Sequence, residues 1–277
     1  MSGSNALAGT LILEGPMIQG ALVQGRADPG TRVEFNGQPV RVSDGGAFLI
    51  GFGRDAPRKL PLQATFPDGS REWRVLKVKQ RKYKVQRVDG LPPRKVTPTE
   101  EDLVRIRAES ALIGKARKRD DARTDFSTGF IWPVQGRISG VYGSQRILNG
   151  EPRRPHYGID IVAPVGTLVL APADGVITLA HPDMFFSGGT MILDHGHGLS
   201  STFLHLHRIL VKEGQRVRQG EPIAEVGATG RITGAHLDWR INLFRHRLDP
   251  ALVLDVMPVR SRPKGALSQR PAQRTTR

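Results

Sequence analysis

Short apolar runs separated by turn residues characterise the first third of the chain. The runs recur about every ten residues, at positions 11–13, 21–23, 33–35 and 47–50. This spacing is typical of strands joined by tight hairpin turns, and the dipeptides Asn36-Gly37 and Asp44-Gly45 lie where such turns are expected. We therefore predict a small, sandwich-like β domain over residues 10–89, preceded by a flexible start at residues 1–9.

A proline-containing linker and a single helix are predicted to follow this domain. The linker spans residues 90–98, and the helix spans residues 99–121. We expect Thr97 to cap the helix, with Pro98 in its first turn and Glu100 completing a capping box. Acidic residues open the segment and basic residues close it, which suits the helix dipole. The helix is expected to connect two domains.

A second β pattern occupies residues 126–258, so the chain as a whole is predicted to be mainly β. The 32 glycines and 20 prolines among 277 residues favour many turns and short strands over long helices. Residues 259–277 contain six basic residues and no acidic one, and we expect a disordered basic tail there.

The composition narrows the available chemistry. The chain has no cysteine, which excludes disulfides, thiolate zinc sites and cysteine nucleophiles, so histidine and carboxylate would have to hold any metal. Lys and Arg exceed Asp and Glu by 41 − 26 = 15, which favours an approach to anionic polymers. Eight of these cations lie within residues 71–88 beside a single acid, Glu72. We interpret this basic strip either as a binding surface for an anionic wall polymer or as a solvated strand face.

Several classes of protein are disfavoured by absent patterns. No run of 18 apolar residues is present, so the sequence predicts no membrane span. The first residues lack the basic and apolar regions of an export signal, so we expect none in the chain as given. No recognition motif supports specific binding of nucleic acid, although the net charge would permit it.

Candidate chemistry concentrates in the second half, where seven of the eight histidines lie between residues 156 and 236. His156 and Asp160 are four residues apart, which is about 13 Å in a straight strand. Ligands of one metal ion must come within about 2 Å of it, so the chain must bend between them. Gly158 lies at the right place to permit the bend.

Two further segments each carry a pair of reactive side chains. His236 and Asp238, like His205 and His207, are two residues apart and project from the same side of a strand. Taken one at a time, these pairs are as typical of buried structural residues as of a site.

The order of the segments resembles that of the lysostaphin/LytM-type zinc metallopeptidases, which cut peptide bonds in bacterial peptidoglycan and have a duplicated hybrid motif domain. The resemblance covers residues 132–250. It rests on these motifs: Pro155-His156-Tyr157-Gly158-Ile159-Asp160, Ala173-Asp174-Gly175-Val176-Ile177, Phe203-Leu204-His205-Leu206, Gly227-Ala228-Thr229-Gly230, His236-Leu237-Asp238-Trp239 and Leu248-Asp249-Pro250. It implies an antiparallel β domain of the LytM type over residues 126–258 and a zinc-dependent metalloendopeptidase that uses one zinc ion.

Residue by residue, the resemblance implies that His156, Asp160 and Asp238 are the metal ligands and that His205 and His236 are catalytic. The third ligand of the family is a histidine, and this chain has Asp238 at that position. A carboxylate oxygen binds zinc at about the same distance as imidazole. Two carboxylates nevertheless cancel the charge of Zn²⁺ and weaken it as a Lewis acid. We therefore expect an intact but altered metal site.

The resemblance also implies that peptidoglycan stems or crosslinks are the substrate, and hence a location in the periplasm or at the cell surface. One alternative is a catalytically weak or inactive relative that binds the wall and activates an amidase. A lipoyl- or biotinyl-carrier domain is a second alternative, but the lysine it needs at a hairpin tip is missing between the matching segments.

Other residues of this region receive lesser roles. Tyr142 and Arg146 are candidates for lining the substrate groove. His195 is expected to be structural, and His207 is expected in solvent at the end of its strand. The remaining histidines, His181 and His246, are expected at the surface.

Overall fold

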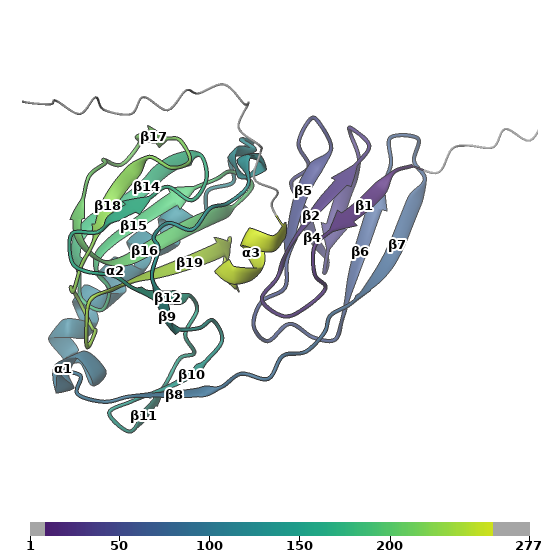
Figure 1. Ribbon diagram of the computed structural model, residues 1–277. Coiled ribbons are helices and arrows are strands. Elements are labelled where there is room, and N and C mark those ends of the chain that lie inside the picture. The colour runs from purple at the N-terminus through teal and green to yellow at the C-terminus, as the bar shows by residue number, and fades with distance from the viewer. Residues whose placement is uncertain (1–8, 257–277) are drawn as a thin grey trace, which may run out of the picture.

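The computed structural model describes residues 9–256, and antiparallel sheets dominate it, so the chain is mainly β as predicted (Figure 1). The predicted tail at residues 259–277 and nearly all of the predicted flexible start lie outside the described residues. Among residues 9–256, no helix combines the length and apolar character that crossing a lipid bilayer requires.

Two antiparallel sheets build the N-terminal half, with the strand orders β1-β2-β5 and β4-β3-β6-β7. Side chains of both sheets, among them Val23, Phe48 and Leu62, share one buried core. The sandwich description of this half stays a prediction. The strands are β1 (Leu11–Glu14), β2 (Leu22–Ala27), β3 (Arg32–Phe35), β4 (Gln38–Val40), β5 (Ala47–Gly51), β6 (Lys59–Thr65) and β7 (Arg71–Lys77).

The hairpin expected at Asn36-Gly37 is present. Both residues have positive φ, 49° and 70°, as a two-residue turn of this kind requires. The turn places Phe35 opposite Gln38 and so sets the register of β3 against β4. Asparagine and glycine tolerate left-handed backbone better than other residues, which is why the dipeptide was a reliable local signal.

Residues 85–88 leave the N-terminal half, contrary to their assignment to the small β domain. They form β8 (Val85–Val88), which runs parallel to β10 (Gln145–Leu148) in a three-stranded sheet completed by β11 (Glu151–Arg153). The partner strand is almost sixty residues away along the chain, so the local alternation of side chains could not reveal it.

The connecting helix is capped two residues later than predicted, and it ends at Arg117 instead of residue 121. A short helix α1 (Pro93–Val96) comes first, and Thr97 ends it instead of capping the long one. The long helix is α2 (Glu100–Arg117), whose N-cap is Thr99 in a capping box with Asp102. Thr99 and Asp102 have the same three-residue spacing that suggested Thr97 and Glu100. Arg94, which bonds both oxygens of Asp102 at 2.6 and 2.7 Å, favours the later start.

A ten-stranded sheet forms the C-terminal half, with the main order β17-β14-β15-β16-β19-β12-β9. The sheet strands of this half are β9 (Arg137–Gly140), β12 (Ile159–Val162), β13 (Leu168–Leu170), β14 (Gly175–Met184), β15 (Gly188–Asp194), β16 (Leu199–Ile209), β17 (Arg216–Val217), β18 (Pro222–Val226), β19 (His236–Leu243) and β20 (His246–Leu248). A 3-10 helix, η1 (Asp125–Thr128), precedes them, and the helix α3 (Pro250–Val256) follows them.

The alternation of side chains along β19 separates the core from the site. Leu237, Trp239 and Ile241 belong to the largest apolar cluster. His236 and Asp238 therefore project from the opposite face of the strand. Part of that face is covered by α2, because Ala116 packs with Leu179, Met184 and Ile192 of the sheet.

Candidate active site

Strand register brings two carboxylates together. β12 pairs antiparallel with β19, and Asp160 lies directly opposite Asp238. Directly opposed residues of an antiparallel pair project from the same face with neighbouring Cβ atoms. Both side chains are buried, with 5% and 1% of their residues' surface exposed.

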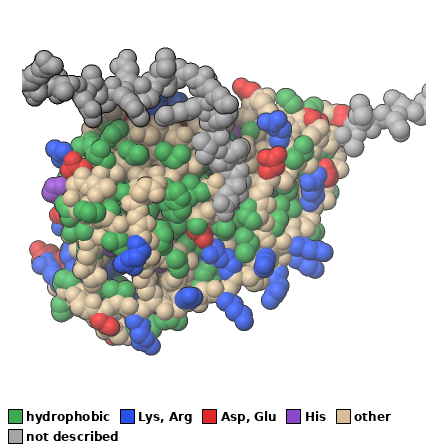
Figure 2. All heavy atoms as spheres, viewed as in Figure 1, with side chains coloured by type: hydrophobic (Ala, Val, Ile, Leu, Met, Phe, Trp, Pro, Cys, Tyr) green, Lys and Arg blue, Asp and Glu red, His purple; other side chains and the backbone are tan. Residues whose placement is uncertain are grey.

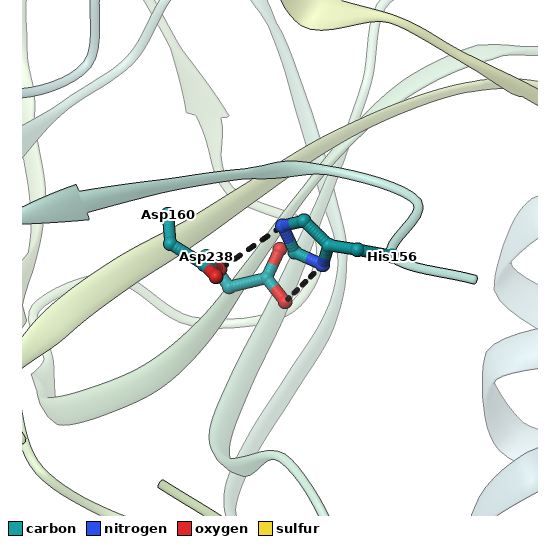
Figure 3. Close-up of side chains that lie close together, drawn as sticks. All are labelled: His156, Asp160 and Asp238. Carbon is teal, nitrogen blue, oxygen red and sulfur yellow. Dashed lines mark ion pairs between the residues drawn. The ribbon is translucent and has the colours of Figure 1, made fainter. Parts of the chain in front are cut away.

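His156 reaches the same point from the segment that precedes β12. Its Nε2 lies 3.1 Å from Oδ1 of Asp160, and its Nδ1 lies 4.0 Å from Oδ2 of Asp238 (Figure 3). The bend that the sequence required is therefore present. Backbone bonds hold the histidine in place: its N–H donates to the carbonyl of Ser144 at 2.8 Å, and its carbonyl accepts from the N–H of Gly143 at 2.7 Å.

Gly158 is needed for close approach. A Cβ at this position would lie 2.4 Å from Oδ1 of Asp238, inside any normal contact distance. Gly140 has the same function on the other side, where a Cβ would lie 2.1 Å from Oδ2 of Asp160. Both glycines thus leave room for the two carboxylates.

The two predicted catalytic histidines lie side by side, with ring centroids 4.9 Å apart. His205 has a left-handed backbone, φ 67°, which is strained for a histidine and is the kind of strain found at functional positions. Its Nδ1 is 2.9 Å from the carbonyl of Thr229, and Nδ1 of His236 is 2.8 Å from that of Gly234. Since a carbonyl only accepts, each Nδ1 carries the proton in the neutral ring and each Nε2 is an acceptor.

Burial lowers the pKa of His205 to about 4, so this ring is neutral at physiological pH. Nε2 of His236 lies 3.7 Å from Oδ1 of Asp160. The structure therefore gathers all five predicted site residues, His156, Asp160, His205, His236 and Asp238, into one group.

Two arginines hold the carboxylates, and sequence reasoning missed this. Arg146 donates to Oδ2 of Asp160 at 2.5 Å. Arg240 contacts both oxygens of Asp238, with Nε at 3.0 and 3.1 Å and Nη2 at 2.5 Å from Oδ2. The sequence could have indicated the contact of Arg240, because this residue follows Asp238 by two positions and so projects from the same face of the strand. Arg146 had been expected to line the groove.

At both aspartates, the neighbouring cationic and histidine side chains lower the pKa more than burial raises it. Burial raises the pKa of Asp238, but Arg240 and His156 hold it well below its ordinary value. At Asp160 burial again raises the pKa, and the contacts to His156 and Arg146 bring it below the ordinary value. Both carboxylates are therefore ionised at neutral pH.

His156, Asp160 and Asp238 could hold a metal ion. One ligand atom from each lies within 4.8 Å of the others. Both ring nitrogens of His156 and Oδ1 of Asp160 are buried and make no well-formed hydrogen bond. Buried polar atoms without partners are costly, and a cation bound to one ring nitrogen of His156 and to Oδ1 of Asp160 would satisfy two of these three atoms. Imidazole and carboxylate are donors that zinc accepts, so the residues fit the ion that the resemblance implied.

Other predicted residues lie apart from this group. Tyr142 does not line a groove: it is 2% exposed, and its hydroxyl donates to the carbonyl of Arg247 at 2.7 Å. His195 is buried between the carbonyl of Asp174, at 2.7 Å, and the hydroxyl of Ser201, at 2.9 Å. His207 is exposed, as expected.

The cations of the predicted basic strip, residues 71–88, fall into two sets: some form ion pairs, and others are exposed. Arg74 pairs with Glu72, and Arg81 forms an ion pair with Asp249 of the C-terminal half at 2.7 Å. Arg71 and Lys77 are exposed on β7, an edge strand, and Lys59 of β6 lies directly opposite Lys77. Between these cations Trp73 and Val75 are 66% and 62% exposed. Lys and Arg side chains gather along the lower edge of the face in Figure 2.

These features of fold and site define a class of protein. Residues 154–250 match the model of Peptidase family M23. A crystal structure of a peptidase M23 from Pseudomonas aeruginosa is 30% identical, covers 86% of this chain and 95% of its own, and superposes with a TM-score of 0.67. The chain belongs to Peptidase family M23, which confirms the predicted LytM-type resemblance.

Curated relatives in this family carry names that refer to the cell wall. The chain is 36% identical over 148 residues to the peptidoglycan DD-endopeptidase ShyA of Vibrio cholerae, covering 52% of this chain and 34% of ShyA. It is 38% identical over 104 residues to ShyB of the same organism, covering 37% of this chain and 24% of ShyB. The chain thus spans about a third or less of the length of these relatives.

Proposed function

We propose that the chain is a zinc-dependent metalloendopeptidase that hydrolyses peptide bonds in bacterial peptidoglycan, in the periplasm or at the cell surface. The observation that carries the proposal is the buried His156, whose two ring nitrogens lack hydrogen bonds and face Asp160 and Asp238. The name of ShyA supports the choice of peptidoglycan as substrate.

A zinc ion on these three residues would polarise the scissile carbonyl and lower the pKa of a water molecule. His205 and His236 each present an unprotonated Nε2, because a backbone carbonyl fixes the proton on Nδ1. Either ring can accept a proton there, and a ring that has done so can donate to a developing oxyanion. Arg146 and Arg240 keep Asp160 and Asp238 ionised and oriented.

The second candidate function is a wall-binding protein that activates an amidase without turnover of its own. The observation that favours it is Arg240, which contacts both oxygens of Asp238, the residue in place of the usual histidine. A cation already on that carboxylate reduces its attraction for a metal ion. The two candidates differ in metal content and in turnover.

Digestion of purified peptidoglycan separates the two candidate functions. We expect the zinc-loaded protein to release soluble fragments with newly formed peptide termini, a chelator to stop the release, and zinc to restore it. Mass spectrometry of the fragments identifies the bond that is cut. A protein that holds one zinc ion per chain and releases nothing would overturn the hydrolase proposal, whereas a protein that binds no zinc and releases nothing would favour the amidase activator.

We further propose that the outer face of β6 and β7, formed by Lys59, Arg71, Trp73, Val75 and Lys77, binds an anionic wall polymer. The face presents cations around an exposed aromatic ring. Glu72 projects from the other face of β7 and pairs with Arg74, and Glu34 of β3, opposite Gln63, is the nearest exposed acid on this face. Multivalent contact between such a face and a polyanion is screened by salt.

The variant Lys59→Gln/Arg71→Gln/Lys77→Gln tests this face. We expect it to bind poly-L-glutamate at least about tenfold more weakly than the parent at low salt, with a shallower dependence on salt concentration. The control variant Arg107→Gln/Lys115→Gln/Lys118→Gln removes the same charge from exposed positions of and beside α2. Equal losses in both variants would show that net charge, and no particular face, governs binding.

A further inference from the structure

We infer that the cavity between the two halves of the chain binds a short peptide that carries a free carboxylate on small apolar residues. The cavity has a volume of about 700 Å³. Strands β3, β4 and β5 and the segment 53–57 line one side, and the segment 243–247 with Arg154 and Tyr157 lines the other. The inference rests on the proposed function for the choice of a peptide, but the site is separate from the metal group.

The lining is strongly cationic. It includes five arginines and only one carboxylate, that of Asp55. Two of the arginines have acidic partners: Arg41 pairs with Asp120 and Arg54 with Asp55, each at 2.6 Å. The other three, Arg154, Arg245 and Arg247, form no ion pair within residues 9–256. This imbalance favours an anionic ligand.

Two buried polar groups in the lining lack partners. His197 is 3% exposed, and neither of its ring nitrogens makes a well-formed hydrogen bond. Nη1 of Arg247 is likewise buried and without a hydrogen bond. An unpaired buried donor such as Nη1 of Arg247 costs free energy, which favours an anion beside this guanidinium. Both side chains thus belong to residues that line the cavity and are polar.

Arg247 is a buried cation close to a second arginine. Burial and the nearby Arg240 lower the pKa of Arg247 to about 10, because both disfavour the charged form. Its guanidinium lies 5.9 Å from the ring centroid of Tyr157. A carboxylate beside it would offset the burial of this charge and form a charge-assisted hydrogen bond.

Apolar side chains also line the cavity, and they determine which uncharged groups of a ligand would fit. Phe35, Leu49, Ile50 and Leu60 from the N-terminal half line the cavity together with Leu243 from the C-terminal half. A ligand that fits both parts combines small apolar groups with a terminal anion. A peptide ending in alanine residues has this chemistry, whereas inorganic phosphate would leave the apolar wall uncovered.

The cavity shares backbone with the metal group. Arg154 and Tyr157, which line it, flank His156 in the sequence. Arg54, also in the lining, donates from Nε to the carbonyl of Gly143 at 2.8 Å, and the N–H of Gly143 donates to the carbonyl of His156. A peptide bound in the cavity is therefore next to the segment that positions His156, where another part of one substrate could reach.

Calorimetric titration of the full chain tests the inference. The probe is N-acetyl-D-alanyl-D-alanine, and its C-terminal amide is the uncharged match. Each is titrated into the zinc-loaded protein and into the chelated protein, and inorganic phosphate is titrated in a separate arm. We expect the acid to bind at least tenfold more tightly than the amide in both metal states, and phosphate to bind more weakly than the acid.

Charge-removing variants locate the binding. Arg245→Gln/Arg247→Gln and, separately, Arg154→Gln are expected to weaken binding of the acid at least tenfold and to leave binding of the amide unchanged. Arg107→Gln, which removes an exposed charge from α2, is expected to bind the acid like the parent. The melting temperature of each variant shows that it is folded, and Arg154→Gln provides a second test if the double variant is not.

Three outcomes would overturn the inference: equal binding of acid and amide, parental binding by all folded variants, or binding that vanishes with the metal. The last outcome would place the carboxylate on the metal group instead. Binding that persists in a protein without hydrolytic activity would support the cavity while refuting the proposed enzyme, so the two proposals fail separately.

Discussion

Replacing His156 with alanine is expected to reduce peptidoglycan hydrolysis by more than about 1,000-fold, because activation of water by the metal would be lost with the ligand. The same variant should lose its stoichiometric zinc, since only two carboxylates would remain and an arginine already pairs with each. Fragment release from labelled peptidoglycan and elemental analysis of the purified protein measure the two effects.

His207→Ala is the matched control. His207 is two residues from His205, but it is exposed and outside the group of possible metal ligands. We expect this variant to keep the parental activity and zinc content. Hydrolysis by folded His156→Ala at the parental rate would refute the proposed site, whatever the zinc content.

Replacing Arg240 with methionine is expected to destabilise the chelated protein by about 3 kcal/mol. The change leaves the carboxylate of Asp238, which is 1% exposed, without its strongest partner, and breaking one side of a buried ion pair typically costs about 3–5 kcal/mol. The low end is appropriate because the side chain of Arg240 is 24% exposed. For a domain of this size the melting temperature should fall by roughly 6–12 °C.

Zinc should recover part of that loss, because a bound cation would again face Asp238. Asp238→Asn/Arg240→Met is expected to be more stable than Arg240→Met alone when both are chelated, since the uncompensated charge is gone. Arg107→Met controls for loss of an exposed arginine. A melting temperature for Arg240→Met equal to that of Arg107→Met would show that the pair with Asp238 contributes nothing.

Local patterns in the chain were enough to predict several features. Asn36-Gly37 predicted a hairpin because its residues tolerate positive φ, and the structure has 49° and 70° there. The alternation along residues 236–243 separated the buried apolar side from the side with His236 and Asp238. The order of the histidine and aspartate segments indicated the family, and the match over residues 154–250 agrees.

Other features depend on contacts between distant segments. The pairing of β8 with β10, the left-handed backbone of His205 and the bond from Arg146 to Asp160 could not be deduced from neighbouring residues. The capping of α2 by Thr99 instead of Thr97 was missed because two nearby segments share the same capping pattern, and the contact of Arg94 with Asp102 favours one of them.

The charge of the site also depends partly on residue types and partly on tertiary contacts. From residue types alone, two carboxylates beside one histidine would cancel the charge of a bound zinc ion and make it a weaker Lewis acid. The fold adds Arg146 and Arg240, one beside each carboxylate. Residue identity thus sets which ligand atoms are available, because that depends on covalent structure. Register and packing set their charge and geometry, because those depend on groups that the folded chain brings within a few ångströms.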